Sequence, residues 1–251
     1  MKPLFVANWK MHGSLAFIRD WTATIAAPSK QCQVAVCPPF PYLATMRAAL
    51  SNDFLIGAQT IAAHRDAGAH TGEVSGTMLA DIGCDLVLVG HSERRNAQHE
   101  NDALCADKIR AAVAAGLQPI LCVGETDCVR EQGGSAAAIN TVLAQINAAL
   151  GDADAKILQK IIIAYEPIWA IGSGKTPTID DIQQLHSAIR ATLIEQTAAF
   201  GGKITLLYGG SVNADNAQEF MNIENVNGFL VGGASLKPQT FNTICNSFSP
   251  L

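Results

Sequence analysis

Eight short runs of apolar residues recur along the chain, and a longer segment with a different hydrophobic period follows each of them. Within a run the apolar residues are consecutive rather than alternating, which is typical of a β-strand that is buried on both faces. The runs are Leu4–Ala7, Val34–Cys37, Phe54–Ala58, Leu86–Val89, Pro119–Val123, Ile161–Tyr165, Ile204–Tyr208 and Val226–Val231.

The segments that follow the runs carry apolar residues three or four positions apart and predict helices. Ser135 and Thr178 stand at the starts of two of them, as N-caps do, and Gly116 and Gly151 follow the ends of Asp102–Ala115 and Ser135–Leu150, as C-terminal caps do. The longer segments are Leu15–Ala26, Tyr42–Leu50, Asp102–Ala115, Ser135–Leu150 and Ile179–Phe200, and the shorter ones are Thr77–Ile82, Ala214–Met221 and Gln239–Cys245.

Strict alternation of strand and helix indicates parallel strands joined by right-handed crossovers. Eight such units in 251 residues predict an α/β fold, a closed (β/α)8 TIM barrel that forms a single domain over residues 1–251. The alternative is an open doubly wound sheet, which would normally show G-x-G-x-x-G after its first strand. Here the first strand is followed by Asn8-Trp9-Lys10, and this favours the barrel.

Composition and charge restrict the classes of partner and the cellular location that we expect for this protein. The net charge of −5 disfavours a nucleic-acid partner, so an anionic ligand would have to rely on local cations and backbone N–H groups. No apolar run reaches the length of a membrane span, and the N-terminal apolar stretch is too short for a signal peptide, so we expect a cytoplasmic protein. The seven cysteines include no C-x-x-C pair, which predicts reduced, buried thiols and disfavours a disulfide framework or a zinc site, and no cluster of His, Cys, Asp and Glu has the spacing of metal ligands.

Active-site groups of such a barrel lie at the carboxyl ends of the strands, and three ionisable residues occupy those positions. Lys10 follows the first strand and is either a cation over the barrel mouth or a surface lysine. His91 follows the fourth strand and is either structural or a hydrogen-bond donor kept neutral by a helix N-terminus. Glu166 ends the sixth strand and is either a general base whose pKa burial raises or half of a buried ion pair.

Glycines mark the ends of the last two strands, in Gly209-Gly210-Ser211 and Gly232-Gly233. Glycines let a backbone approach an anion closely, and the loops after the seventh and eighth strands are the usual phosphate site of this architecture. The glycine-containing segment between Pro167 and Pro177 suits a mobile lid. It lacks the spacing of a nucleotide P-loop.

These segments resemble the triosephosphate isomerase family over essentially the whole chain, in family order and spacing. The matching segments are Asn8–Met11, Gly57–Gln59, Thr71–Ser75, Gly90–Arg95, Cys122–Glu125, Ala164–Gly172, Tyr208–Val212 and Leu230–Ser235. The resemblance implies an enzyme of glycolysis and gluconeogenesis that interconverts dihydroxyacetone phosphate and D-glyceraldehyde 3-phosphate without a cofactor.

The resemblance also implies a role for each site residue. Glu166 would be the base, neutral His91 the electrophile that polarises the carbonyl, and Lys10 the cation that stabilises the enediolate. Asn8 would hold the substrate, and Glu93 would support the site. The phosphate would be bound by backbone N–H groups of Gly172, Ser211, Gly232 and Gly233. The lid would comprise Pro167, Ile168, Trp169, Ala170, Ile171, Gly172, Ser173, Gly174, Lys175 and Thr176.

The family is dimeric, so the resemblance implies a homodimer in which the loop from Gln59 to Glu73 reaches the partner's site with Thr71 at its tip. His12, Ser173 and Ala97-Gln98 depart from the family pattern, and none of them removes a catalytic group. Two other interpretations are a different phosphate-binding barrel isomerase or synthase and a non-catalytic binding or scaffold protein. Neither predicts Lys10, His91 and Glu166 together.

Overall fold

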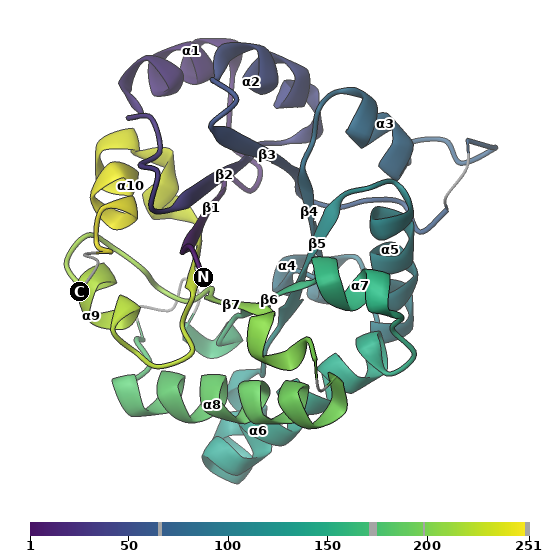
Figure 1. The fold of residues 1–251 in the computed structure, drawn as a ribbon, viewed down its shortest axis with the longest axis vertical. Helices are drawn as coiled ribbons and strands as arrows, with labels where there is room; N and C mark the ends of the chain where they lie inside the picture. The colour runs from purple at the N-terminus through teal and green to yellow at the C-terminus, as the bar shows by residue number, and fades with distance from the viewer. Residues whose placement is uncertain (65–66, 171–174, 198, 249–251) are drawn as a thin grey trace.

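The computed structural model describes residues 1–64, 67–170, 175–197 and 199–248. Eight parallel strands pair in chain order, and β8 returns to pair with β1, which closes the sheet into a barrel (Figure 1). The predicted closed barrel is therefore confirmed. The strands are β1 (Leu4–Asn8), β2 (Gln33–Cys37), β3 (Phe54–Ala58), β4 (Leu86–Val89), β5 (Gln118–Val123), β6 (Ile162–Tyr165), β7 (Thr205–Tyr208) and β8 (Gly228–Val231).

Helices surround the barrel as an outer ring (Figure 1). Four 3-10 turns, η1 to η4, span Phe40–Tyr42, Ile168–Ala170, Gly201–Lys203 and Gly233–Leu236 in the described residues. None of the helices within the described ranges is both long and apolar enough to cross a membrane. The α-helices are α1 (Leu15–Thr24), α2 (Leu43–Ala49), α3 (Gly76–Asp81), α4 (Ser92–Ala97), α5 (Asp102–Ala114), α6 (Asp127–Leu150), α7 (Ala155–Lys160), α8 (Ile179–Thr197), α9 (Ala217–Met221) and α10 (Pro238–Cys245).

The observed helices differ from the predicted ones in two details. The described part of the chain holds ten α-helices rather than eight, and the two additional ones are α4 and α7, with six residues each. The predicted helix from Ser135 to Leu150 is found, but a further helical stretch from Asp127 precedes it and joins it across a kink at Gly134 (φ 59°). The Thr126 side chain caps the start of this further stretch by accepting a hydrogen bond from the Val129 N–H.

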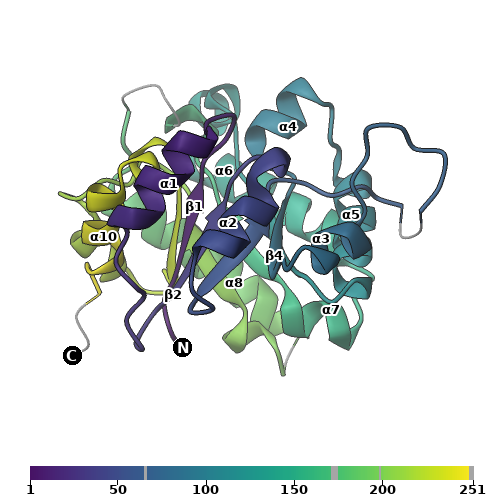
Figure 2. The same ribbon diagram turned by 90° about the horizontal axis from the view of Figure 1, so that it is seen from above.

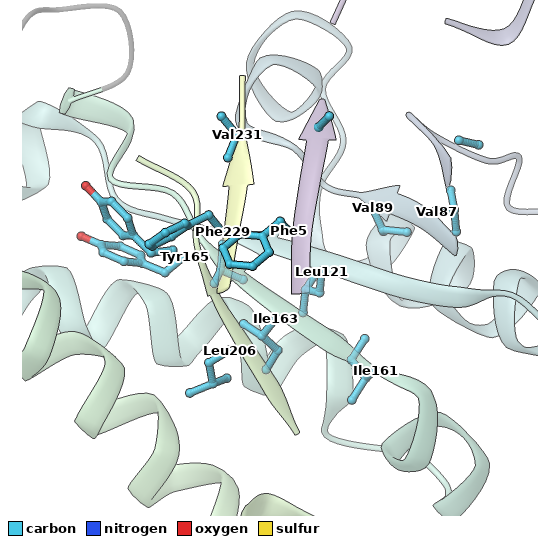
Figure 3. Packing of buried hydrophobic residues seen from close by; sticks show 14 of the residues in the cluster. Phe5, Val87, Val89, Leu121, Ile161, Ile163, Tyr165, Leu206, Phe229 and Val231 are labelled. Carbon is cyan, nitrogen blue, oxygen red and sulfur yellow. The ribbon is translucent and has the colours of Figure 1, made fainter. Parts of the chain in front are cut away.

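Strand residues alternate between two apolar layers because successive side chains point to opposite faces of a sheet. The outer layer lies between barrel and helices and contains Phe5, Phe229 and Tyr165; the Phe5 and Phe229 rings are 5.8 Å apart (Figure 3). The inner layer fills the barrel and consists of Leu4, Val6, Ala35, Cys37, Leu86, Leu88, Ile120, Cys122, Ile162, Ala164, Leu207 and Leu230.

This alternation fixes which polar side chains face the barrel axis. In β1 the inward residues Leu4 and Val6 are followed at the same spacing by Asn8, and in β6 Ile162 and Ala164 are followed by Glu166. Both polar residues therefore lie just above the apolar interior, at the carboxyl ends of the strands. Figure 2 shows this end of the barrel beside α4, on the side opposite the two chain termini.

All seven cysteines are free thiols. Five are buried, as predicted, whereas Cys128 in the first turn of α6 is exposed and Cys245 is half-buried. Burial raises the pKa of the Cys105 thiol to about 11, which keeps that side chain protonated at neutral pH.

A buried charge cluster ties α4 and α5 to the long loop after β3. Glu100, 2% exposed, accepts hydrogen bonds from Arg94 (2.5 Å) and Lys108 (2.5 Å), and Lys108 also donates to Thr60 (2.9 Å). Burial raises the pKa of Glu100. The hydrogen bonds from Lys108 and Arg94 lower it by a larger amount, so the net pKa lies below the ordinary value. The ionised form of Glu100 therefore stabilises the fold.

We expect Glu100→Gln to lower the free energy of unfolding at pH 7 by about 3 kcal/mol, because it leaves the buried Lys108 ammonium without its counter-charge. The folded-state pKa is lowered, so the contribution is complete above the ordinary value of 4.5 and is lost as pH falls through the folded-state pKa. Urea melts at pH 7 and pH 4 measure the difference from wild type, which should shrink at pH 4.

The matched control is Asp107→Asn, which removes an exposed ion pair with Arg110 in the same helix. Its effect at pH 7 should stay below about 1 kcal/mol. Equal effects of the two substitutions would show that the buried cluster contributes no more than a surface pair.

Candidate active site

The predicted site residues gather around one cavity of about 310 Å³ at the carboxyl ends of the strands. The carboxyl ends of five strands, β1, β4, β6, β7 and β8, contribute to it, so residues far apart in sequence face a common space. Gly172 lies outside the described residues, and the other predicted catalytic and substrate-binding residues line the cavity. Its lining comprises Asn8, Lys10, His91, Glu166, Gly209, Gly210, Ser211, Val212, Leu230, Gly232, Gly233 and Ala234.

Glu166 is 2% exposed, and its carboxylate accepts hydrogen bonds from two donors. Its Oε1 lies 3.0 Å from His91 Nε2, and its Oε2 accepts from the backbone N–H of Ser92 at 3.1 Å. Its own backbone N–H donates to the Val123 carbonyl at 2.8 Å, which fixes the residue beside β5. Among the described residues no lysine or arginine pairs directly with Glu166, so it is not half of the ordinary buried ion pair considered as an alternative.

The net pKa of Glu166 differs from the predicted direction. Burial alone does raise its pKa, as expected, but the nearby His91, the hydrogen bonds from His91 and Ser92, and the charge of Lys10 lower it and prevail. The net pKa lies below the ordinary value. In this arrangement Glu166 is therefore an ionised carboxylate whose oxygens are both occupied.

His91 is the N-cap residue of α4, and its ring bridges the helix and Glu166. Its Nδ1 accepts a hydrogen bond from the backbone N–H of Glu93 at 3.2 Å, so this nitrogen carries no proton. These two contacts therefore assign the proton of the neutral ring to Nε2, which points at Glu166. This is the geometry of a neutral imidazole that donates from Nε2.

The pKa of His91 also differs from the expectation. Burial lowers it, but the Glu166 carboxylate raises it and prevails, so the pKa lies above the ordinary value. The helix N-terminus was expected to lower the pKa, and its effect is outweighed while a carboxylate lies 3.0 Å away. The raised pKa thus depends on where the Glu166 side chain lies.

Lys10 is held over the cavity by its backbone and by a carboxylate. Its φ of 50° turns the chain sharply after β1, and its N–H donates to Asn8 Oδ1 at 3.0 Å. Its Nζ lies 2.7 Å from Glu93 Oε1. Gln59 donates to the Lys10 carbonyl at 2.8 Å, a supporting contact that sequence reasoning missed. Lys10 therefore belongs to the cavity wall and is not merely a surface lysine.

The opposite wall is built from the glycine loops after β7 and β8. A Cβ at Gly210 would lie 2.1 Å from the Tyr208 hydroxyl oxygen, so only glycine fits there. Gly232 and Gly233 lead into η4, and no acceptor for either N–H is found among the described residues. These two donors are available to an anion in the cavity.

The described part of the predicted lid is tied to the start of α6 and to β7. Trp169 donates to Glu125 at 2.8 Å, and Lys175 Nζ lies 3.1 Å from Asp127. The Ser211 hydroxyl donates to the Ala170 carbonyl at 3.0 Å. Pro167, Ile168 and Thr176 are also described, whereas the predicted lid residues Ile171, Gly172, Ser173 and Gly174 lie outside the described residues.

Glu125 is a further site residue to which sequence reasoning gave no role. It is fully buried, and its Oε1 accepts from the Tyr165 hydroxyl (3.0 Å) as well as from Trp169. Burial raises its pKa, which these hydrogen bonds lower only in part. The one feature that could have indicated it is its place two residues after the fifth apolar run.

The described side chains include no group of three or more His, Cys, Asp or Glu residues placed to hold a metal ion. The His64 and His70 rings stack on each other 3.7 Å apart. A reaction without a metal remains a prediction.

Comparison with known proteins agrees with this geometry. A family model described as Triosephosphate isomerase matches residues 3–248. The chain is 46% identical to the triosephosphate isomerase of Thiobacillus denitrificans over 98% of both chains. It is 44% identical to that of Acidiphilium cryptum and 43% identical to that of Nitrosococcus oceani, again over 98% of both chains. This chain belongs to the triosephosphate isomerase family.

Proposed function

We propose that this protein interconverts dihydroxyacetone phosphate and D-glyceraldehyde 3-phosphate by moving one proton through an enediolate, without metal or cofactor. The observation that carries the proposal is the Glu166 carboxylate at the mouth of a barrel, in one cavity with Lys10, His91 and the unpartnered N–H groups of Gly232 and Gly233. Membership of the family supports the choice of substrate.

Glu166 acts as the base. Its carboxylate takes the proton from the carbon beside the carbonyl, the C–H electron pair forms the carbon–carbon double bond, and the carbonyl π electrons move onto oxygen. The same carboxyl then returns the proton to the neighbouring carbon. Before this, one Glu166 oxygen must leave the Ser92 N–H or His91 Nε2, so substrate competes with the protein's own donors.

His91 acts as a neutral electrophile. Its Nε2–H donates to the carbonyl oxygen of the substrate and carries a proton between the two substrate oxygens. Once Glu166 turns towards carbon, the contribution that raised the pKa of His91 weakens, while burial and the helix N-terminus still favour the uncharged ring. The Glu93 N–H keeps Nδ1 as an acceptor throughout.

Lys10 and the glycine loops stabilise charge. The Lys10 ammonium, oriented by Glu93, stabilises the enediolate oxygen and the phosphate dianion. The Asn8 amide helps to hold the substrate oxygens. Backbone N–H groups of Gly172, Ser211, Gly232 and Gly233 bind the phosphate, which suits a chain whose net charge is −5.

The segment Pro167–Thr176 acts as a lid that closes over the substrate and excludes water, which prevents loss of phosphate from the intermediate. The contacts of Trp169 with Glu125, of Lys175 with Asp127 and of Ser211 with Ala170 join the described parts of this segment to neighbouring parts of the barrel.

The same protein is proposed to be a cytoplasmic homodimer that binds neither nucleic acid nor membrane. The described parts of the loop from Gln59 to Glu73, residues 59–64 and 67–73, project from the side of the barrel in Figure 2, and Thr71 is exposed on the second part. Met11 is 94% exposed directly beside Lys10, where a partner's loop would cover apolar surface.

The first expected result is that the purified protein isomerises D-glyceraldehyde 3-phosphate in a coupled assay with a metal chelator present. Glu166→Gln should lower kcat at least about a hundredfold, because the amide accepts no proton at neutral pH. The thermal unfolding of both proteins, followed by circular dichroism, checks that the fold is retained.

Glu219→Gln changes an exposed carboxylate in α9 and should leave kcat unchanged. A wild-type rate equal to the blank would favour the scaffold interpretation, and near-wild-type activity of Glu166→Gln would remove this residue from its role.

The second expected result concerns the titration of Glu166 in His91→Gln. The substitution removes the main group that lowers the pKa of Glu166, and burial remains, so that pKa should rise. The titration midpoint of the Glu166 side-chain carboxyl, followed by ¹³C NMR in the ligand-free proteins, should therefore lie at higher pH in the variant than in wild type. An unchanged midpoint would contradict the coupling.

The third expected result is a mass of twice 26.5 kDa by light scattering on a sizing column. Thr71→Arg should shift the protein towards monomer at low concentration, because it places a charge at the proposed contact. Thr243→Arg, at an exposed position of α10, is the control. A wild-type monomer would contradict the dimer.

A further inference from the structure

Strand β5 extends beyond its neighbour β4 on one side. The last β4–β5 register pair is Val89 with Leu121, after which the chain turns at Gly90 (φ 69°) into α4. On its other side β5 continues along β6, because the Val123 carbonyl accepts from the Glu166 N–H and the Glu125 carbonyl accepts from the Ile168 N–H. Carbonyls of a strand alternate between its two edges, so the peptide groups of Gly124 face the side that β4 has left.

A glutamine side chain occupies that open edge. Gln145, from the middle of α6, accepts from the Gly124 N–H at 2.9 Å and donates to the Gly124 carbonyl at 3.0 Å. A primary amide offers the same donor and acceptor as the peptide group of a neighbouring strand. On this edge the Cys122 carbonyl, the first one past the last β4 pair, accepts a hydrogen bond from Arg95 at 3.3 Å, and Gln145 takes the place of a β4 residue at the following position, Gly124.

The segment Gly124–Glu125, which Gln145 holds in this way, packs against the end of β6 that leads into Glu166. A Cβ at Gly124 would lie 1.8 Å from the Glu166 carbonyl oxygen, so the Glu166 backbone packs directly against Gly124. The next residue, Glu125, binds Tyr165 and the lid residue Trp169. A shift of Gly124–Glu125 would therefore move both the base and the first turn of the lid.

We infer that Gln145 is a positioning residue for the proposed reaction, whose side-chain amide completes the open edge of β5 and thereby sets the place of Glu166. The inference rests on the proposed function. It predicts a specific kinetic signature, because the phosphate-binding loops follow β7 and β8, and among the described residues no hydrogen bond joins them to Gly124. Loss of the amide should affect kcat and leave KM nearly unchanged.

The test compares Gln145→Met with Gln196→Met by steady-state kinetics on D-glyceraldehyde 3-phosphate. Methionine keeps the length of the side chain and loses both hydrogen bonds. We expect Gln145→Met to lower kcat about tenfold or more, since small displacements of a catalytic group are costly, with KM within about twofold of wild type. Gln196→Met, which breaks only an exposed bond from α8 to Asn147, should match wild type.

Gln145→Glu provides a second, pH-dependent readout that does not rely on the methionine variant folding. A protonated carboxyl has one donor and one acceptor, like the amide, whereas an ionised one only accepts and faces the Gly124 carbonyl. The ratio of its kcat to that of wild type should therefore rise as pH falls. A pure loss of stability would make this ratio fall or stay constant.

The inference is overturned if Gln145→Met, corrected for its folded fraction by circular dichroism, has kcat within twofold of wild type, or if the ratio for Gln145→Glu does not rise on acidification. A wild-type protein with no isomerase rate would contradict the proposed function and the inference with it. An active wild type with either of those results contradicts the inference alone.

Discussion

The pairing of the Glu166 carboxylate with the start of α4 is the interaction on which the site depends. A carboxylate buried at the end of an apolar strand needs hydrogen-bond donors, and here they are the Ser92 N–H and His91 Nε2–H. Both lie at the N-terminus of one short helix, so β4 has to stop at Val89 and turn at once. The early end of β4 leaves the edge of β5 open, and Gln145 closes it.

The same pairing sets the pKa values of both Glu166 and His91 in the ligand-free protein. The donors keep Glu166 ionised despite its burial, and Glu166 in turn raises the pKa of His91. Each group therefore has a different proton affinity once substrate separates them: the base becomes stronger as it leaves its donors, and the imidazole becomes less basic. Both changes favour proton abstraction from carbon.

The barrel and most of the site could be predicted from sequence, because eight continuous apolar runs allow few other folds and parallel strands bring Lys10, His91 and Glu166 to one edge. The directions of the pKa shifts of Glu166 and His91 could not be predicted, because they depend on which hydrogen-bond partners lie about 3 Å from each buried group. Helix α4 has no apolar residue before Ala97, so no hydrophobic period marks it in the sequence. Gln59 and Gln145 bind backbone atoms through half-buried amides, for which no sequence pattern exists.

The most direct test is a ¹³C NMR titration of the Glu166 side-chain carboxyl in the ligand-free protein, with the resonance assigned by its absence in Glu166→Gln. If His91 and Ser92 hold the carboxylate as described, it should remain ionised from neutral pH down to the ordinary value of 4.5. A titration midpoint above that value would show that burial prevails over these donors and would contradict the account.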